Sequence, residues 1–406
     1  MSMGNHFVFA KAKTTYFQLL VYHFQTSEQE QLLDRYLEQA YLPALHKLGF
    51  KQVGVFKPIK NSENADKLIY VLSSSPKLED FANLDVGLLK DPAYLSSGAF
   101  YLDLAHNRAP FSRIETILMK AFGYEKNGGP EVFQEYEVPT PEIKSNQILI
   151  KTEAFNLNNF EALQRAGQFK PVDHRIIPGR DVAGFVEKVG EDVIGFDIGD
   201  RVVAHGHHSY AEYSIGEDSN TVLIPSGVPY LAAAGIVTPG LAAYKGVHLF
   251  GKVQAGQTVV VKGASGGVGS LAAQIAMDVG AKVIGVGSSE NEEYVKSLGV
   301  DQYVAYDQED PAEVLADTAD VVIDAALNGN GAESDVKIVK DGGIVASVAD
   351  NDAPTDKTVH FNHIHPTQEI SDDDALNAML KLMAAGKLKI RIGYKLPFTL
   401  DGVIKG

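Results

Sequence analysis

The stretch VVVKGASGGVGSLAAQIA, Val259–Ala276, decides the fold of the larger part of this chain. Thr258–Lys262 is rich in β-branched residues and predicts a buried strand. Several glycines follow and predict a tight turn, and a helix with one apolar face comes next. The face consists of Val268, Leu271, Ala272, Ile275, Ala276 and Val279. A second strand, KVIGVG at 282–287, completes a βαβ unit.

A glycine turn in this position can hold a dinucleotide. Free backbone N–H groups at a helix start attract phosphate, and glycine lets the backbone come close to it. The alternative is an ordinary turn between a strand and a helix, and the complete βαβ context favours the dinucleotide. The expected contact residues are Ala264, Ser265, Gly266, Gly267, Val268 and Gly269.

The residues after the second strand bear on the choice between NADH and NADPH. A site for NADH usually has an Asp or Glu there, which binds the ribose 2′-hydroxyl. This chain has Ser288 and Ser289 instead, whose hydroxyls are able to bind a 2′-phosphate. Acidic residues follow at once and no basic residue occurs before Lys296. NADPH is therefore expected, and NADH stays possible.

Other regions predict different architectures. Residues 1–118 give a β-α-β-β-α-β pattern, the ferredoxin-like arrangement, with a strand at 16–24 and a capping box at Ser27 and Glu30. In this pattern KNSENAD is a turn, KLEDFANLDVGLLKD a second helix and RIETILMKAF the last strand. Residues 119–236 contain many short strands and predict an antiparallel β domain. Residues 237–365 alternate strands and helices, which predicts a parallel sheet. The acidic run at 371–375 predicts a helix start.

Composition excludes several classes of protein. The chain has 406 residues, enough for two or three domains. Its formal net charge of −16 argues against nucleic acid and anionic membranes as partners. It has no cysteine, which excludes disulfides, thiolate metal sites and thiol nucleophiles. No apolar run is long enough to span a membrane, and no signal peptide is evident, so a cytoplasmic location is expected.

From Met119 onward the chain resembles the zinc-independent medium-chain dehydrogenase/reductase family, in its quinone oxidoreductase or zeta-crystallin branch. The segments that carry the resemblance are MKAFGYEKNGGPEVFQ, AFNLNNFEALQRAG, IPGRDVAGFVEKVGEDVIGFDIGDRV, YAEY and ASGGVG. The resemblance implies a GroES-like catalytic domain with an inserted Rossmann domain. It also implies NADPH-dependent reduction of quinones or α,β-unsaturated carbonyls, and it is a family in which dimers are common.

The resemblance also bears on zinc. Zinc-dependent relatives have a His–Glu pair where this chain has Arg180 and Asp181, and they use cysteine ligands that this chain lacks. A tetrahedral zinc site of that type is therefore not expected. His205, His207 and His208 offer either a three-histidine metal site or a polar loop, and their adjacent places on an extended segment favour the loop.

The resemblance implies roles for further residues. Asn158 matches an asparagine beside the nicotinamide, and Glu161 stands where relatives often have Asp or Glu, although it is equally a solvated loop carboxylate. Arg180 is either a substrate contact or, by slight preference, an ion-pair partner of Asp181. Asn291 stands where relatives bind the 2′-phosphate with a basic residue. Tyr306 matches a tyrosine near the adenosine phosphate, or is a sheet-edge aromatic.

Some pocket residues depart from the family. Leu163 replaces a common tyrosine, and Ala242 replaces a threonine near the nicotinamide. Both departures weaken the assignment of the pocket and leave the fold assignment intact.

Residues 16–118 resemble NIPSNAP-like domains of the dimeric α+β barrel group, which implies a homo-oligomer. The segment ILMKAF, at 117–122, ends that domain and also begins the next one, which suggests a fusion without a linker. Residues 366–406 return to the catalytic domain and stop before the final strand of the relatives, so that domain looks truncated.

Three hypotheses follow. The first, which we favour, is a zinc-free oxidoreductase that transfers hydride from NADPH to a quinone or enone. The second is a scaffold protein that binds the dinucleotide without catalysis. The third is a variant zinc alcohol dehydrogenase, which the missing ligands nearly exclude.

Overall fold

The computed structural model of the protein describes residues 16–58, 67–77, 79–102, 113–116, 118–326, 331–349 and 352–406. The predicted turn KNSENAD, at 60–66, falls outside the described residues. The chain divides into two compact units, Met1–Met119 with Glu137–Thr140, and Lys120–Tyr136 with Pro141–Gly406.

The first unit has the element order β-α-β-β-α-β that the sequence predicts. Its elements are β1 (Tyr16–Phe24), α1 (Ser27–Tyr36), the π-helical turn η1 (Leu37–Tyr41), α2 (Leu42–Lys47), β2 (Gln52–Phe56), β3 (Lys67–Ser75), α3 (Glu79–Ala82), α4 (Leu84–Leu89), α5 (Pro92–Leu102) and β4 (Arg113–Thr116). The strands form one antiparallel sheet in the order β2-β3-β1-β4.

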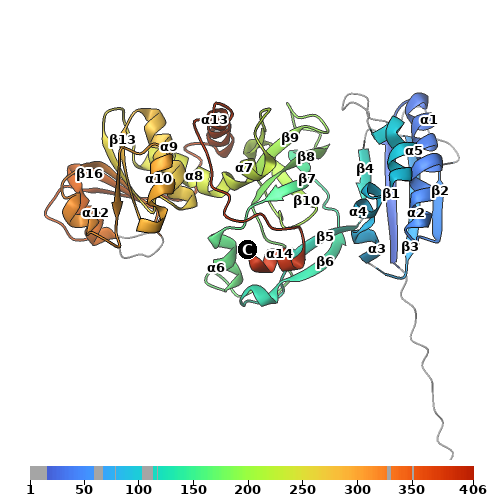
Figure 1. The fold of residues 1–406 in the computed structure, drawn as a ribbon, viewed down its shortest axis with the longest axis horizontal. Coiled ribbons are helices and arrows are strands. Elements are labelled where there is room, and N and C mark those ends of the chain that lie inside the picture. Colours follow the sequence, from blue (N-terminus) through green and yellow to red (C-terminus); the bar gives the residue numbers. More distant parts are fainter. Residues whose placement is uncertain are drawn as a thin grey trace, which may run out of the picture. The chain divides into compact units, whose positions relative to one another are not determined.

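Helices cover one face of this sheet, as Figure 1 shows for α1, α2 and α5. Tyr22 and Phe24 of β1 and Ile69 of β3 pack there against Leu33 and Leu37, so alternate strand residues form the core. The opposite face carries Phe17 and Phe56, which are 56% and 54% exposed. The sheet is therefore apolar on both faces.

Two predictions about this unit are wrong in detail. The capping box is formed by Thr26 and Gln29, one residue before the expected pair Ser27 and Glu30, because Thr26 is the last extended residue before α1. The predicted strand RIETILMKAF is two strands, since β4 ends at Thr116 and β5 begins at Leu118. The two halves join different sheets, so no single strand completes both domains.

The second helix predicted for this unit, over KLEDFANLDVGLLKD, is shorter and more broken than expected. It is divided into α3 and α4, and α5 follows as a third helix that the sequence pattern did not predict.

The second unit begins with an antiparallel β part, whose strands β5 and β6 each include residues assigned to the first unit. Its elements are β5 (Leu118–Gly123), η3 (Pro130–Val132), β6 (Gln134–Pro139), β7 (Gln147–Phe155), α6 (Asn159–Arg165), β8 (Asp181–Val189), β9 (Arg201–His205), β10 (Tyr213–Glu217), η4 (Asp218–Asn220), β11 (Thr221–Leu223) and α7 (Tyr230–Gly235). Five of these strands form an antiparallel sheet in the order β10-β7-β8-β9-β11. The predicted antiparallel β domain is thus confirmed.

An α/β part follows. Its elements are α8 (Val237–Lys245), η5 (Gly246–Phe250), β12 (Thr258–Lys262), α9 (Gly267–Val279), β13 (Lys282–Gly287), η6 (Ser289–Asn291), α10 (Glu292–Ser297), β14 (Gln302–Ala305), α11 (Pro311–Val314), β15 (Ala319–Asp324), α12 (Ala332–Ile338), β16 (Val339–Ser347) and β17 (His360–His363). All six strands are parallel, in the order β14-β13-β12-β15-β16-β17. This Rossmann-like sheet confirms the prediction made from the alternating pattern.

The chain then returns to the β part through α13 (Asp372–Ala384) and ends with α14 (Leu400–Lys405), as Figure 1 shows. Ser371 caps α13, so the acidic run does begin a helix, as predicted. Val403 of α14 packs with Phe122, Tyr124 and Phe133. The last segment therefore belongs to the core of the β part.

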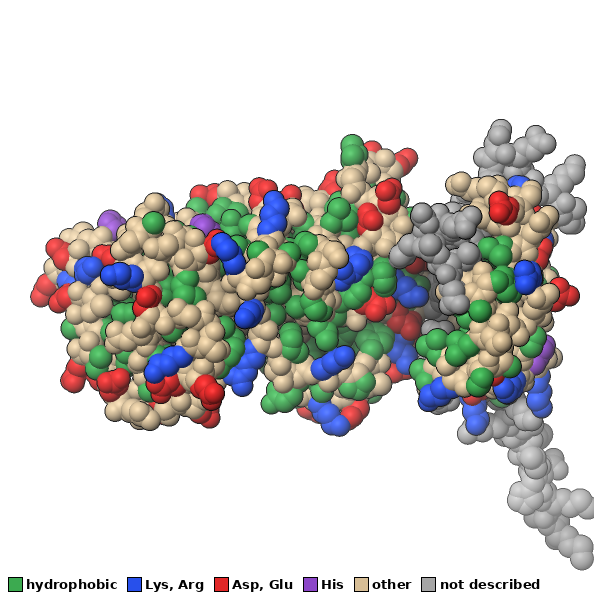
Figure 2. Space-filling model, turned by 45° about the horizontal axis from the view of Figure 1, so that its top comes forward, with side chains coloured by type: hydrophobic (Ala, Val, Ile, Leu, Met, Phe, Trp, Pro, Cys, Tyr) green, Lys and Arg blue, Asp and Glu red, His purple; other side chains and the backbone are tan. Residues whose placement is uncertain are grey.

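Surface charge is mixed. On the face shown in Figure 2, basic side chains lie among acidic ones and do not gather into one patch. No helix within the described ranges is long and apolar enough to cross a membrane.

Candidate active site

The glycine turn lies at the carboxyl end of β12. Gly263 has φ +68°, a conformation that favours glycine, and a Cβ there would lie 3.2 Å from the backbone of Ala325. Gly269 packs so closely against the turn that a Cβ added at this position would lie 2.2 Å from the carbonyl oxygen of Gly263. Two glycines are therefore required by packing within the turn itself.

Gly266 and Gly267 have a different role, because both are exposed. Gly266 is the N-cap of α9 and has no side chain to accept from the first N–H groups of the helix. Those groups lack partners within the helix, so they are available to an anion. The geometry fits the diphosphate of a dinucleotide, with Ser265 and Val268 half-buried beside it.

One expected contact is wrong. Ala264 is fully buried, its N–H donates to the carbonyl of Val286 at 3.0 Å, and its methyl packs near Gly285. It therefore holds the turn against β13 and has no surface to offer a cofactor.

Residues after β13 lie at the same edge of the sheet, because β12 and β13 are parallel neighbours. Asn291 Nδ2 donates to Ser288 Oγ at 2.9 Å. Ser289 donates both its N–H and its hydroxyl to Asp307, at 2.8 and 2.6 Å. These two bonds lower the pKa of Asp307 and leave Ser289 with no free donor for a phosphate. Tyr306 is 60% exposed and its N–H bonds to Gly287.

A second polar group surrounds Asp181 at the start of β8. Its fully buried carboxylate accepts from Thr238 Oγ1 at 2.5 Å, from Asn158 Nδ2 at 2.9 Å and from Asn156 Nδ2 at 3.3 Å. The backbone N–H of Thr238 adds a fourth bond at 3.2 Å. Burial raises the pKa of Asp181, whereas Thr238 and Asn158 act in the opposite direction. Sequence reasoning missed Thr238, because only the fold brings α8 to β8.

Arg180 does not pair with Asp181, so the favoured interpretation of Arg180 is wrong. Its guanidinium carbon lies 3.7 Å from the ring centre of Phe160, and no ion pair with Asp181 occurs among the described residues. The physical reason is that the bonds from Thr238, Asn156 and Asn158 already occupy the buried carboxylate.

Glu161 lies beside this group on α6. It is only 4% exposed, and neither carboxylate oxygen has a hydrogen-bond partner in the described part of the chain. Burial raises the pKa of Glu161, and the Asp181 carboxylate raises it further. The solvated-carboxylate alternative is therefore wrong, since an unpaired buried carboxyl group favours its protonated form.

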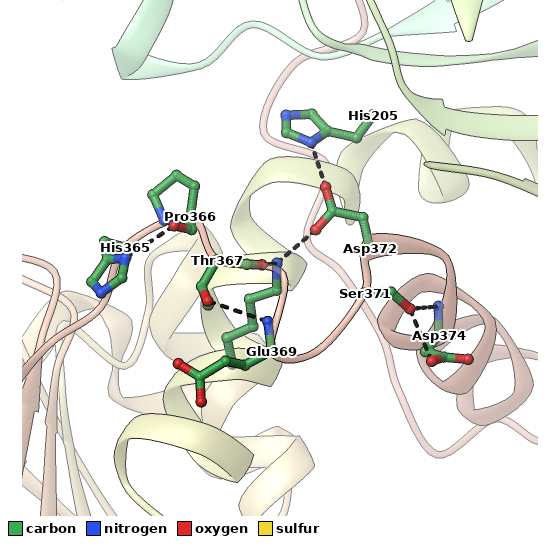
Figure 3. Close-up of polar contacts among 9 residues, drawn as sticks. His205, His365, Pro366, Thr367, Glu369, Ser371, Asp372 and Asp374 are labelled. Carbon is green, nitrogen blue, oxygen red and sulfur yellow. Dashed lines mark hydrogen bonds and ion pairs between the residues drawn. The ribbon is translucent and has the colours of Figure 1, made fainter. Parts of the chain in front are cut away.

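His205 extends the group toward α13, as Figure 3 shows. It lies opposite Asp181 across the β8–β9 pair, and its Nδ1 lies 2.8 Å from Asp372 Oδ2. The buried ammonium group of Lys245 donates to Asp372 Oδ1 at 2.6 Å and to the carbonyl of Thr367 at 2.8 Å. Asp372 thus joins β9, α8 and α13, a connection that the sequence pattern did not reveal.

The three histidines are directed to different places. His208 has φ +59° and its Nδ1 lies 2.8 Å from the carbonyl oxygen of Ile177, whereas the backbone of His207 pairs with Ile215. Burial and the neighbouring His208 lower the pKa of His207. Within the described ranges, no three His, Cys, Asp or Glu side chains form a metal-binding group.

A cluster of buried charged side chains lies at the end of β12, directly before the glycine turn. Lys262, the last residue of β12, donates to Asp335 at 2.6 Å and to the carbonyl of Gly331 at 3.1 Å. Burial raises the pKa of Asp335 to about 7. The neighbouring Asp324 also raises this pKa, whereas the positive charge of Lys262 lowers it. This cluster fixes the end of β12 to β15 and α12.

Comparisons with known proteins agree with this architecture. Residues 144–248 match the alcohol dehydrogenase GroES-like domain, and residues 267–371 match the family described as zinc-binding dehydrogenase. The chain is 35% identical over 301 residues to 2-methylene-furan-3-one reductase of Solanum lycopersicum, covering 70% of this chain and 74% of the relative.

Two further relatives have related names. NADPH-dependent alkenal/one oxidoreductase of Arabidopsis thaliana, described as chloroplastic, is 34% identical over 300 residues, with 70% and 74% of the two chains covered. Quinone oxidoreductase of Homo sapiens is 34% identical over 244 residues, with 57% and 73% covered.

Solved structures agree as well. The quinone oxidoreductase from Coxiella burnetii superimposes with a TM-score of 0.61 and 27% identity, covering 71% of this chain and 94% of that one. The GroES-like part, the parallel sheet and the extent of these matches together show that the chain belongs to the medium-chain dehydrogenase/reductase family.

Proposed function

We propose that this protein is an NADPH-dependent, zinc-free oxidoreductase that reduces a quinone or an α,β-unsaturated carbonyl compound. The observation that carries the proposal is the exposed glycine turn at the uncapped start of α9, at the edge of a parallel sheet. The names of the relatives, which include quinone and alkenal/one oxidoreductases, support the substrate class. When bound, NADPH supplies the hydride.

The catalytic part of this proposal is formed by residues 119–236 and 366–406, and residues 237–365 bind the dinucleotide. Ser265, Gly266, Gly267 and Val268 receive the diphosphate, buried Gly269 lets the turn close behind them, and Tyr306 lies toward the adenosine end. NADH stays possible as a weaker cofactor.

Zinc has no place in this site. The sequence has no cysteine. Arg180 packs on the ring of Phe160, and Asp181 accepts hydrogen bonds from the side chains of Thr238 and Asn158. A substrate carbonyl must then be polarised by hydrogen bonds. Asn158 Oδ1 accepts a hydrogen bond from Asn156, and Asn158 Nδ2 donates one hydrogen to Asp181. The second N–H of Asn158 Nδ2 is left for a substrate oxygen.

The reaction also consumes a proton. Glu161 is buried, has no hydrogen-bond partner among the described residues and lies beside Asn158 and Asp181, so it keeps a proton at higher pH than an exposed glutamate. We assign it as the acid of the reaction. Arg180 lies close enough to influence Glu161, which gives it a positioning role beside the substrate.

The proposal is tested by titrating the purified protein with NADPH and NADH and following nicotinamide fluorescence. Oxidation of NADPH is then measured with and without an added quinone or enone. Saturable oxidation that depends on the acceptor is the expected result. Binding without turnover for any acceptor supports the non-catalytic scaffold instead, and failure to bind either dinucleotide contradicts both.

The first unit suggests assembly. We infer that it is a ferredoxin-like domain related to NIPSNAP-like dimeric α+β barrels, because its strand order β4-β1-β3-β2 is the one that a β-α-β-β-α-β chain gives in that fold. Phe17 and Phe56 lie on the sheet face opposite the helices and are more than half exposed. A homo-oligomer in which two such faces pair would bury them. A cytoplasmic location stays a prediction.

A further inference from the structure

A segment distant in sequence reaches the residues after β13. Lys389 forms two hydrogen bonds with the buried side chain of Gln274 on α9, both 2.9 Å long. The side chains of Ile390 and Ile392 pack toward Gly235 on α7, with a Cβ at Gly235 lying 3.2 and 3.6 Å from them. Contacts on both sides therefore fix the backbone around Arg391.

Arg391 is directed at the end of β13. Its Nη1 donates to Asn291 Oδ1 at 3.0 Å, and its guanidinium carbon lies 4.9 Å from the ring centre of Tyr294. Accepting this bond orients Asn291 so that its amide donates to Ser288 Oγ. Arginine has five N–H donors, and Arg391 is exposed, so several donors face solvent beside Ser288.

The charge around Ser288 makes this cation important. Glu290, Glu292, Glu293 and Asp307 all lie in or beside the segment that follows β13. Lys296 is already paired with Glu292. Arg391 forms no ion pair with any described residue, so its positive charge is available to a ligand. An added phosphate would be repelled by the acidic residues unless a cation compensates.

We propose that Arg391 and Asn291 bind the 2′-phosphate of NADPH and set the preference for NADPH over NADH, with Ser288, whose hydroxyl donates to Glu290 at 3.5 Å, beside them. This rests on the proposed function, because it specifies how the same cofactor site selects its ligand. Guanidinium groups match phosphate oxygens in geometry and form strong charge-assisted hydrogen bonds with them. Ser289 takes no part, since Asp307 occupies its donors.

The experiment compares wild type, Arg391→Ala, Arg391→Lys and the control Lys395→Ala, which removes one exposed positive charge from the same segment. Dissociation constants are measured for NADPH and NADH by nicotinamide fluorescence. Competition by 2′,5′-ADP is compared with competition by 5′-AMP, because the difference between their affinities gives the contribution of the 2′-phosphate to binding.

Arg391→Ala is expected to weaken NADPH and 2′,5′-ADP binding about ten- to hundredfold, with NADH and 5′-AMP unchanged within about twofold. Arg391→Lys should recover part of the loss, and Lys395→Ala should change all four ligands little. Unchanged NADH binding also shows that the variant is folded.

Three results would overturn the assignment of Arg391 and leave the proposed function intact. They are an equal loss for NADPH and NADH, no loss for NADPH, and a wild-type protein that prefers NADH. A wild-type protein that binds no dinucleotide contradicts the proposed function itself and the assignment of Arg391 with it.

Discussion

At the scale of single residues, the β part contains two buried carboxyl groups with opposite surroundings. Asp181 accepts four hydrogen bonds, whereas Glu161 accepts none from the described residues. The donors around Asp181 oppose the effect of burial, which still raises its pKa, whereas burial and the Asp181 carboxylate together raise the pKa of Glu161. One group therefore organises the site, and the other is suited to deliver a proton.

Glu161→Gln tests the second role. A raised pKa in the folded state means that stability from this group is present at low pH and is lost as the pH rises through the folded pKa. The variant should therefore be more stable than wild type at pH 8, by about 1–2 kcal/mol, and equal to it at pH 4. Urea unfolding at both pH values measures this difference.

Activity separates catalysis from structure in the same variant. If Glu161 supplies the proton, kcat should fall about a hundredfold while the dissociation constant for NADPH stays the same. An unchanged kcat would assign Glu161 a purely structural position.

Asp181→Ala tests the organising role. Removing the carboxylate leaves the buried donors of Thr238 and Asn158 without an acceptor, so the free energy of unfolding should fall by about 2–4 kcal/mol. The exposed Asp192→Ala is the matched control and should change stability by no more than about 0.5 kcal/mol. Similar values for both variants would show that the Asp181 bonds do not stabilise the fold.

At the scale of elements, the unit β12-turn-α9-β13 combines two kinds of glycine. Gly269 is required for the turn to close, whereas Gly266 has φ −77°, and the nearest atom to its Cβ would lie 3.4 Å away. Packing of the helix and access of the ligand therefore depend on different positions of one motif.

Two alanine variants separate these requirements. Gly269→Ala should lower the melting temperature by several degrees, because the added Cβ would overlap the Gly263 carbonyl. Such a shift corresponds to a loss of ~2 kcal/mol in the free energy of unfolding. Gly266→Ala should melt with the wild type but bind NADPH about tenfold more weakly, since its methyl faces the phosphate site. Thermal melts and NADPH titration check both. If the two variants behaved alike, packing and binding would not be separable.

Element boundaries show the limits of local patterns. The strand at Thr258–Lys262 and the following helix were predictable, because their apolar spacing and the glycines between them are local signals. The capping box was predicted one residue late, since Thr26 and Ser27 are equally good cap residues and only the backbone angles choose between them. The division of RIETILMKAF depends on which sheet each half joins, and that is a tertiary property.

At the scale of the whole molecule, the first unit is expected to govern assembly. Phe17 pairs with Ser74 and Phe56 with Tyr70 across β3, which places both phenylalanines on the same sheet face. Analytical ultracentrifugation should show wild type as a dimer or larger. The double variant Phe17→Asp and Phe56→Asp should be monomeric, because charges on that face oppose its burial. NADPH affinity should not change. A monomeric wild type would contradict this expectation.

The sequence by itself determined the GroES-like and Rossmann-like classes of the second unit, the glycine turn and the absence of thiolate zinc ligands, because periodicity, glycine spacing and composition are local properties. Only the tertiary structure decided which side chains meet. Thr238 reaches Asp181 across 57 positions, His205 reaches Asp372 across 167, and Arg391 reaches Asn291 across 100. Ala264 is buried and Arg180 lies on Phe160 for the same reason. A hydrogen bond or the burial of a side chain depends on which elements the fold brings together. The spacing of residues along the chain does not predict which elements these are.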